Sequence, residues 1–596
     1  MPKEPSPRPI RLWPGVAAVI LLLLARFGIK AAIPGFRGFA LGMQGALLAA
    51  LVVVLWWLFL SRAAWVDRLG GLALMVAAMF ATWQLRHESM GPFWLLGYAV
   101  PFLCVAFVAA AVASRRLAET RRRAILAATI VLAAGAWTLA RTEGISGDHV
   151  ATFDWRWSKT PEERLVAAAA PHPPAARGAA VPSPPAPAVS AVEAAPRSSV
   201  EPTAVLSAPI VTAANPEWPG FRGPRRDGVV RGARIATDWS ASPPVELWRR
   251  PVGPGWSSFA VRGRHVYTQE QRGDDEIVSC YDAATGRPVW THSDAARFFE
   301  SNAGPGPRGT PALAHGRVYT FGATGIVNAL DAADGSVVWT RSVTSGDDSK
   351  IPYWGFSSSP LVVGDLVVIA AAGQLLAYDA ATGEPRWTGA AGGGYSSPQL
   401  VTLGGVPQIV LMNGAGATSV APADGKVLWE HVWKGSPIVQ PAVTADGDLL
   451  IVAQTGSGTR RLAATLGAGG WTVAERWTSM GLKPYFNDFV VHEGHAFGFD
   501  GRILSCIDLA DGAQKWKGGR YGNGQLILLP DQDLLLVLSE DGELALVRAA
   551  PGQYAEIARF KAVSGKTWNH PVLVGDVLLV RNGAEMAAFR LPAGGA

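Results

Sequence analysis

The sequence predicts an eight-bladed all-β propeller that follows five transmembrane helices and a Pro/Ala-rich linker. A ten-residue pattern ending in D-x-x-T/D-G-x-x-x-W returns at 281–290, 330–339, 378–387 and 507–516. Its copies lie about 40–50 residues apart, a period typical of propeller blades made of four short strands. Five long apolar runs occupy the N-terminal quarter of the chain. We therefore divide the chain into 1–141, 142–215 and 216–596.

Each copy of the pattern predicts a strand, a tight turn and a second strand. In the copy at 378–387, Asp379 can accept hydrogen bonds from the backbone ahead of it, and Gly383 can adopt a positive φ without steric cost. Trp387 is large and flat, which suits a position between two packed sheets.

The number of copies predicts the number of blades. Clear or degenerate repeats end at Trp290, Trp339, Trp387, Trp429, Trp477 and Trp516, with equivalents at Trp248 and Phe560. The last unit ends near Leu591 without a Trp strand of its own. A strand around Val245–Val252 can complete it, which would close the ring and leave no exposed edge strands.

The apolar runs have the length of membrane-spanning helices. They cover about 12–28, 39–60, 69–85, 92–113 and 124–140. Arg and Lys are concentrated before the first run and in the second and fourth loops, which predicts a cytoplasmic N-terminus. An odd number of spans then places the propeller in the periplasm of a bacterial inner-membrane protein. The runs contain no clear Asp, Glu or Lys, which favours an anchor. Their Trp residues leave open a quinone-binding surface.

The segments around the propeller carry little chemistry. Residues 142–215 are rich in Pro and Ala and predict a disordered tether. The Gly- and Pro-rich lead-in 218–230 predicts a clasp over the ring. Cys104, Cys280 and Cys506 form no CxxC motif, so we interpret them as buried strand or helix residues. No basic-aromatic stripe indicates nucleic-acid binding.

The repeats resemble the pyrroloquinoline quinone (PQQ) repeat, which quinoprotein dehydrogenases share with propellers of the outer-membrane assembly lipoprotein type. The lead-in WPGFRGPRRDG and the tail KTWNHPVLVGDVLLVRNGAEMAAFRL are similar to those of PQQ-like propeller proteins. Five helices ahead of a propeller also resemble membrane-bound quinoprotein glucose dehydrogenase. The resemblance implies an eight-bladed ring over about 218–591, but the ring serves both enzymes and scaffolds.

Candidate site residues stand at the starts of the first strands, which face the central funnel of a propeller. For a tricarboxylated quinone, the predicted partners are Arg308, Trp354, Arg520, Lys566 and Asn569. For Ca²⁺, the available oxygen donors are Glu300 and Asn302, or Asn487 with Asp488. Asp488 or His570 would then abstract a substrate proton. The alternative interpretation is that these groups bond the turns of neighbouring blades.

Two functions follow from these alternatives. The first is a tethered binding or scaffold module for an envelope protein or a small ligand. The second is a PQQ- and Ca²⁺-dependent dehydrogenase of sugars or alcohols that passes electrons to membrane quinone. Quinoprotein alcohol dehydrogenases have a pair of adjacent cysteines, and this sequence has none. The missing pair favours the first function.

Overall fold

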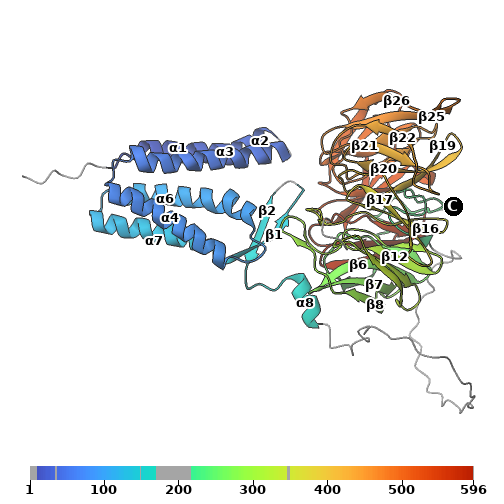
Figure 1. The fold of residues 1–596 in the computed structure, drawn as a ribbon, viewed down its shortest axis with the longest axis horizontal. Helices are drawn as coiled ribbons and strands as arrows, with labels where there is room; N and C mark the ends of the chain where they lie inside the picture. Colours follow the sequence, from blue (N-terminus) through green and yellow to red (C-terminus); the bar gives the residue numbers. More distant parts are fainter. Residues whose placement is uncertain (1–9, 34–35, 148–149, 169–216, 345–349, 595–596) are drawn as a thin grey trace, which may run out of the picture.

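The computed structural model describes residues 10–33, 36–147, 150–168, 217–344 and 350–594. A helical part and a β-propeller lie side by side along the long axis, and a small hairpin lies between them (Figure 1). The chain passes from the helices through the hairpin to the ring.

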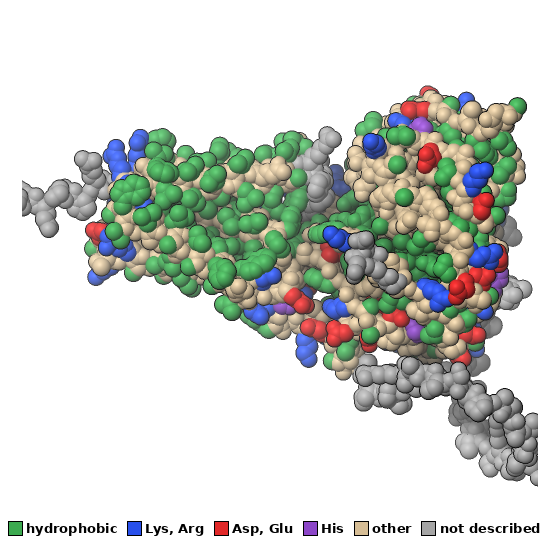
Figure 2. All heavy atoms as spheres, viewed as in Figure 1, with side chains coloured by type: hydrophobic (Ala, Val, Ile, Leu, Met, Phe, Trp, Pro, Cys, Tyr) green, Lys and Arg blue, Asp and Glu red, His purple; other side chains and the backbone are tan. Residues whose placement is uncertain are grey.

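The helical part is a bundle of long apolar helices. Its elements are α1 (Trp13–Leu23), η1 (Leu24–Gly28), α2 (Ile29–Ala32), α3 (Phe36–Leu55), η2 (Trp56–Leu60), α4 (Trp65–Leu85), α5 (Pro92–Trp94), η3 (Leu95–Ala99), α6 (Val100–Ala113), α7 (Glu119–Gly135) and η4 (Ala136–Thr138). Apolar side chains cover its surface, and Lys and Arg gather at the end away from the propeller (Figure 2). This surface is suited to lipid rather than to water.

The number of spans differs from the prediction. Among the described residues, four helical segments are long and apolar enough to cross a membrane: Trp13–Ala32, Gly38–Leu60, Trp65–Leu85 and Pro92–Ala113. The fifth predicted run corresponds to α7, which begins with the charged turn Glu119–Arg123. Because the charged turn shortens its apolar stretch, α7 is not among these four, and the predicted count of five is corrected to four.

The first part of the predicted linker forms defined structure. Strands β1 (Ala140–Ile145) and β2 (Ala151–Trp155) pair as an antiparallel hairpin, and helix α8 (Pro161–Ala168) follows. Phe153 of β2 packs against Trp94, Tyr98 and Trp137 of the helical part, with ring centroids 5.4–5.5 Å apart. The prediction of a disordered linker is therefore wrong for residues 142–147 and 150–168, and residues 169–216 lie outside the described part of the chain.

The propeller has eight blades of four antiparallel strands. Blades 1 to 4 consist of β5 (Ala260–Arg262), β6 (His265–Arg272), β7 (Asp275–Asp282) and β8 (Pro288–Asp294); β11 (Ala312–Ala314), β12 (Arg317–Phe321), β13 (Ile326–Asp331) and β14 (Val337–Ser342); β15 (Leu361–Val363), β16 (Leu366–Ala371), β17 (Gln374–Asp379) and β18 (Pro385–Gly389); β19 (Gln399–Leu403), β20 (Val406–Asn413), β21 (Gly416–Val420) and β22 (Val427–Val432). Blades 5 to 7 consist of β23 (Ala442–Val443), β24 (Leu449–Ile451), β25 (Thr459–Gly467) and β26 (Gly470–Ser479); β27 (Val490–His492), β28 (His495–Asp500), β29 (Ile503–Asp508) and β30 (Gln514–Arg520); β31 (Gln525–Leu529), β32 (Leu534–Leu538), β33 (Glu543–Arg548) and β34 (Glu556–Lys561), with the short η5 (Pro530–Gln532) between β31 and β32.

Blade 8 confirms the predicted closure. It combines β35 (Val572–Val574), β36 (Val577–Arg581) and β37 (Glu585–Arg590) with β4 (Val245–Pro251) from the start of the propeller. A short strand, β3 (Glu217–Trp218), pairs with β5 of blade 1, and β9 (Phe299–Glu300) pairs with β10 (Gly304–Pro305) in the loop before blade 2. The eight-bladed fold predicted from the repeats is therefore confirmed, and Cys104, Cys280 and Cys506 are free and buried, as interpreted.

The repeat pattern fixes the contact between neighbouring blades. The Trp of one copy packs on the turn glycine of the next copy, and its Nε1 donates to a carbonyl of that turn. Trp339 Nε1 donates to Ala380 O at 3.1 Å, and a Cβ on Gly383 would lie 2.6 Å from the Trp339 ring. Trp290 and Trp387 make the same contacts with the turns at Gly335 and Gly425. The predicted position of the Trp between packed sheets is thus confirmed.

We expect Gly383→Ala to lower the free energy of unfolding by about 2–4 kcal/mol, because Gly383 has φ +71° and no room for a Cβ. Gly364→Ala is the matched control, since Gly364 has φ +58° but open space around it, and should cost only about 1 kcal/mol. Thermal unfolding of the two variants compares the costs, and equal losses would contradict the packing role of Gly383.

The lead-in closes one end of the central channel. Arg226 donates to Pro360 O of blade 3, Arg222 donates to Phe489 O of blade 6, and Val230 N donates to Leu528 O of blade 7. Leu313 N of blade 2 donates to Pro219 O. The predicted clasp is therefore present, and it spans the ring from blade 2 to blade 7.

Candidate functional site in the central channel

A ring of side chains lines the channel at one equivalent position in each blade. In blade order the ring positions are Ser258, Thr310, Ser359, Ser397, Gln440, Asp488, Gln525 and His570. From blade 1 to blade 6, the backbone N–H at each position donates to the side-chain oxygen of the next, over 2.8–3.0 Å. The hydrogen bonds between these positions therefore join neighbouring blades.

Asp488, a predicted proton acceptor, belongs to this ring. Its Oδ1 accepts the Gln440 N–H at 2.8 Å, and its Oδ2 lies 3.6 Å from Arg222 Nε and 3.3 Å from His570 Nε2. Burial opposes ionisation, but Arg222 and His570 outweigh it and hold the pKa of the carboxyl below its usual value. Asp488 is therefore a poor base, because Arg222, His570 and the Gln440 N–H already stabilise its ionised form.

His570, the second predicted proton acceptor, is enclosed with Asp488. Burial lowers the pKa of His570, an effect that Asp488 opposes. The imidazole of His570 packs edge-on against the phenyl ring of Phe221 in the lead-in, and the two ring centroids are 5.0 Å apart. The structure thus brings the two predicted catalytic residues together, in contact with the lead-in.

The ring surrounds a cavity of about 180 Å³. Its walls are mainly aromatic and come from several blades: Trp256, Trp354, Tyr395, Tyr485, Phe486 and Trp568. Phe221 of the lead-in also lines it, as do Ile145, Ser146 and Gly147 of the hairpin. We call this cavity the chamber. It can hold a small, flat, largely apolar group.

Lys566, a predicted cofactor ligand, holds the hairpin. Its Nζ donates to Ile145 O at 2.9 Å and lies 4.5 Å from the ring centroid of Trp568 and 5.4 Å from that of Trp256. Burial lowers the pKa of Lys566 to about 8, although Glu540 and Glu300 oppose the shift. A second cavity, of about 750 Å³, lies beyond Lys566 and shares Trp256 and Ala303 with the chamber.

Arg308, Glu300 and Asn302 form one local network. Arg308 donates to the carbonyls of Pro305, Gly306 and Gly304, and its Nη2 lies 3.4 Å from Glu300 Oε1. Glu300 accepts the N–H groups of Asn302 and Ala303. Burial lowers the pKa of Arg308 to about 10. The loop before blade 2 thus uses the side chains of Arg308 and Glu300 for its own structure, whereas Asn302 Oδ1 has no hydrogen-bond partner among the described residues.

A buried carboxyl beside this loop makes stability depend on pH. Burial raises the pKa of Glu276 to about 7, against 4.5 when exposed. Because the folded state binds the proton more tightly, this group stabilises the fold at low pH and the contribution is lost as pH rises from about 4.5 to 7. We expect Glu276→Gln, which keeps an acceptor for Ala323 N, to raise stability at pH 8 by up to about 3 kcal/mol. Chemical unfolding at pH 5 and pH 8 measures the effect; a gain of equal size at both pH values would contradict it.

The remaining predicted residues are dispersed. Trp354 lines the chamber. Asn569 donates to Ser257 O at 2.7 Å and to Gly255 O at 3.3 Å, and so joins blades 8 and 1. Asn487 Oδ1 accepts the Tyr485 N–H at 2.8 Å. Arg520 lines a separate cavity of about 270 Å³ with Arg502 and Asp541.

This arrangement does not fit the predicted quinone and Ca²⁺ groups well. The three expected anion partners lie apart: Arg308 is bound to its own loop, Lys566 holds the hairpin and Arg520 faces another cavity. The oxygens of Glu300 and Asn487 are occupied by backbone N–H groups. The aromatic walls would suit a flat ring, but the donor set for a tricarboxylate and its metal is not assembled.

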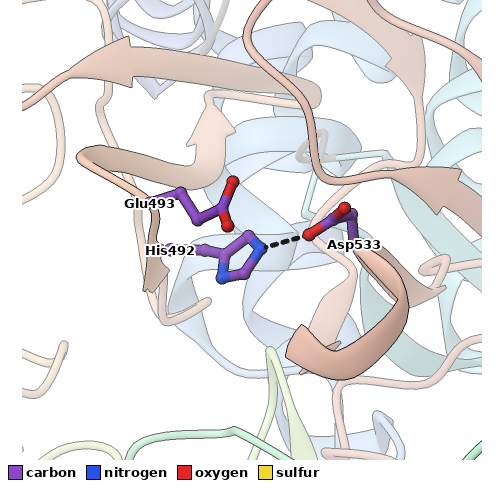
Figure 3. A group of neighbouring side chains, drawn as sticks. All are labelled: His492, Glu493 and Asp533. Atoms are coloured by element: carbon purple, nitrogen blue, oxygen red, sulfur yellow. Dashed lines mark hydrogen bonds and ion pairs between the residues drawn. The ribbon is translucent and has the colours of Figure 1, made fainter.

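One group of possible metal ligands among the described residues lies away from the chamber. It consists of His492, Glu493 and Asp533, in the turns that end the first strands of blades 6 and 7 (Figure 3). The dashed line in Figure 3 joins His492 Nε2 to Asp533 Oδ1, 2.7 Å apart. His315 Nε2 bonds Gly364 O at 2.8 Å between the same turns of blades 2 and 3. We therefore interpret the His492–Asp533 contact as a link between blades.

Sequence reasoning missed two features of the site. Glu540 accepts Trp568 Nε1 at 2.9 Å, Asn523 N at 3.0 Å and Gly147 N at 2.5 Å. The second feature is the hairpin tip, which was predicted to be part of the linker. Gly144 and Gly147 on either side of Ile145 could have indicated it, because this sequence differs from the Pro/Ala-rich composition that follows.

Comparisons with known proteins agree with this architecture. A family model described as outer membrane protein assembly factor BamB matches residues 245–370 and 323–555. The BamB protein of Yersinia pestis is 26% identical over 320 residues, which cover 51% of this chain and 70% of that protein. The quinohemoprotein alcohol dehydrogenase of Comamonas testosteroni is 32% identical over 121 residues, 19% of this chain and 16% of the enzyme.

Among solved structures, BamB from Moraxella catarrhalis superposes with a TM-score of 0.45 at 14% identity, over 59% of this chain and 99% of that protein. The two matched ranges overlap and together run from β4, the strand that completes blade 8, to blade 7. They cover more than half of the chain. By the eight blades, their repeat and this match, the chain belongs to the PQQ-repeat propeller family whose model is described as the outer membrane protein assembly factor BamB.

Proposed function

We propose that this chain is a binding or scaffold module: a propeller on an inner-membrane anchor that binds an envelope protein or a small ligand at its central channel. The propeller would be periplasmic, as the Lys- and Arg-rich end of the helical part away from the propeller supports (Figure 2). A cytoplasmic N-terminus would also require α7 to cross the membrane, because four spans alone return the chain to the side on which it began. Membrane association is supported by the four apolar helices.

The state of Asp488 is the observation that carries this proposal. A general base needs a free lone pair directed at its substrate. Asp488 instead accepts the Gln440 N–H and faces Arg222 and His570. These contacts support a role in joining blades 5, 6 and 8 to the lead-in, and they leave the channel a place for binding rather than for proton abstraction.

The second candidate function is a PQQ-dependent dehydrogenase that passes electrons to membrane quinone. The aromatic walls of the chamber favour it, as does the similarity to the Comamonas testosteroni enzyme over a short segment. When bound, PQQ would supply the redox chemistry. The separation of Arg308, Arg520 and Lys566 weakens this candidate.

Two measurements on the purified full chain distinguish the candidates. For a binding module, PQQ with Ca²⁺ should leave the melting temperature unchanged, and sugars and alcohols should give no dye reduction. A saturable rise in melting temperature with one quinone per chain shows binding, because a ligand that binds only the folded state must stabilise it. That rise together with dye reduction would overturn the proposal. For the partner, a photo-crosslinking residue at Tyr353, which is 58% exposed and bonded to Asn302, should yield an adduct with one envelope protein. The same residue at Val432, 70% exposed on an outer strand, is the control.

A further inference from the structure

The hairpin tip is held by the propeller through its backbone. Ile145 N donates to Asn302 O at 2.8 Å, Ile145 O accepts Lys566 Nζ at 2.9 Å, and Gly147 N donates to Glu540 Oε1 at 2.5 Å. Each contact uses a main-chain group of the tip. Through these three contacts the propeller recognises the path of the tip's backbone.

Two glycines make this contact possible. A Cβ on Gly144 would lie 2.1 Å from Asn302 O, and a Cβ on Gly147 would lie 1.6 Å from Asn523 Nδ2. Gly144 also has φ +96°, which other residues rarely adopt. Ile145 between them lines the chamber. The tip is therefore shaped for close approach to the propeller.

The receiving surface is assembled from three parts of the ring. We call it the propeller mouth and define it by Asn302, Asn523, Glu540, Lys566 and the rings of Trp256 and Trp568, which are 4.6 Å apart. Glu540 and Asn302 accept hydrogen bonds from the tip, and Lys566 donates one. These groups are buried or half-buried, so they make strong hydrogen bonds when paired and are costly when left unpaired.

We propose that the propeller mouth is a receptor for glycine-bearing β-hairpin tips, and that residues 144–147 occupy it in cis. The partner that this mouth fits is an envelope protein that presents a β-turn with glycine at the two points of close approach. This inference rests on the proposed binding function and adds to it the chemistry of the partner and its competitor.

Residues 144–147 can leave the propeller mouth and be replaced by a partner, because their release does not detach the chain that follows. A two-stranded hairpin is marginally stable alone. The chain after it is fastened separately: Glu162 of α8 pairs with Arg297 at 2.7 Å and accepts the Gly273 N–H at 2.9 Å. Release of the tip therefore leaves α8 in place. The tethered tip has an effective concentration in the millimolar range, so a free peptide competes poorly until the tip is displaced.

The test uses the full chain in lipid nanodiscs and a fluorescent synthetic peptide of residues 140–155. In the Gly147→Val variant, whose own tip cannot dock, the peptide should bind about tenfold or more tighter than in the wild type. A peptide with Val at both glycine positions is the matched control and should not bind. Adding Lys566→Met, which keeps the contact with the Trp rings but removes the donor, should weaken binding about tenfold.

Equal binding to the wild type and to Gly147→Val would overturn the cis occupancy. Absence of peptide binding to both would overturn the receptor. If Gly147→Val does not fold, Ile145→Lys gives a second route, because a cation at a position that lines the mainly aromatic chamber is costly to bury and would favour release of the tip. The peptide assay contains no partner and no quinone, so its failure is distinguishable from a failure of the crosslinking or cofactor experiments.

Discussion

Arg581→Met is expected to lower the free energy of unfolding by about 3–5 kcal/mol. Arg581 is fully buried in blade 8, and its guanidinium donates to Gly253 O at 2.7 Å, Gln269 O at 3.0 Å and Thr268 Oγ1 at 2.6 Å. The carbonyl acceptors belong to blade 1 and to the segment that leads into it. Removal of the guanidinium leaves these acceptors buried and unpaired where the ring closes.

Chemical unfolding measures this loss. Arg590→Met is the control, because Arg590 lies in the same blade but its pair with Asp576 is one-third exposed at 3.4 Å. Surface pairs contribute about 0–1 kcal/mol. If the two variants lose similar stability, Arg581 does not fasten the closure.

Asp488→Ala is expected to cost a similar amount, about 3–5 kcal/mol, and for a related reason. The change leaves the Arg222 guanidinium buried without its carboxylate and the Gln440 N–H without its acceptor. Asp488→Asn keeps an acceptor for Gln440 but removes the charge, so its loss should be smaller. The comparison separates the hydrogen bond from the ion pair.

Thermal unfolding of the three proteins tests this order. If Asp488 were a catalytic base with no structural role, both substitutions would leave the melting temperature unchanged and abolish dye reduction in a protein loaded with quinone. That outcome would favour the dehydrogenase over the binding module.

The fold could be predicted from the sequence because the signal is periodic. Each repeat places a Trp and a glycine at fixed spacing, and the structure shows that Trp339 packs on Gly383 of the next repeat. The closing strand could be predicted from the unit that lacks its own Trp. The number of spans was harder to predict, because α7 joins apolar residues to the charged turn Glu119–Arg123 in one helix.

The site was predicted less well, for a physical reason. Sequence position places Asp488, His570, Arg308 and Lys566 near the channel, but it does not show which partners use their atoms. Arg308 is bound to the carbonyls of its own loop, and Lys566 is bound to Ile145, more than four hundred residues earlier in the chain. Contacts between residues so far apart in the chain leave no local sequence pattern. The hairpin was also missed, because most of the predicted linker is rich in Pro and Ala.

The pairing of β4 with β37 in blade 8 also determines when the propeller can close during synthesis. Strand β4 ends at Pro251, and its partner β37 begins at Glu585, near the end of the chain. Ile235, which follows the lead-in, likewise pairs with Ala593. While the chain is being synthesised, the first strand of the propeller has no partner, and the lead-in has no blade 7 to bind. Closure must therefore wait until the three C-terminal strands of blade 8 have been synthesised, and until then one open strand edge is exposed to association with other chains.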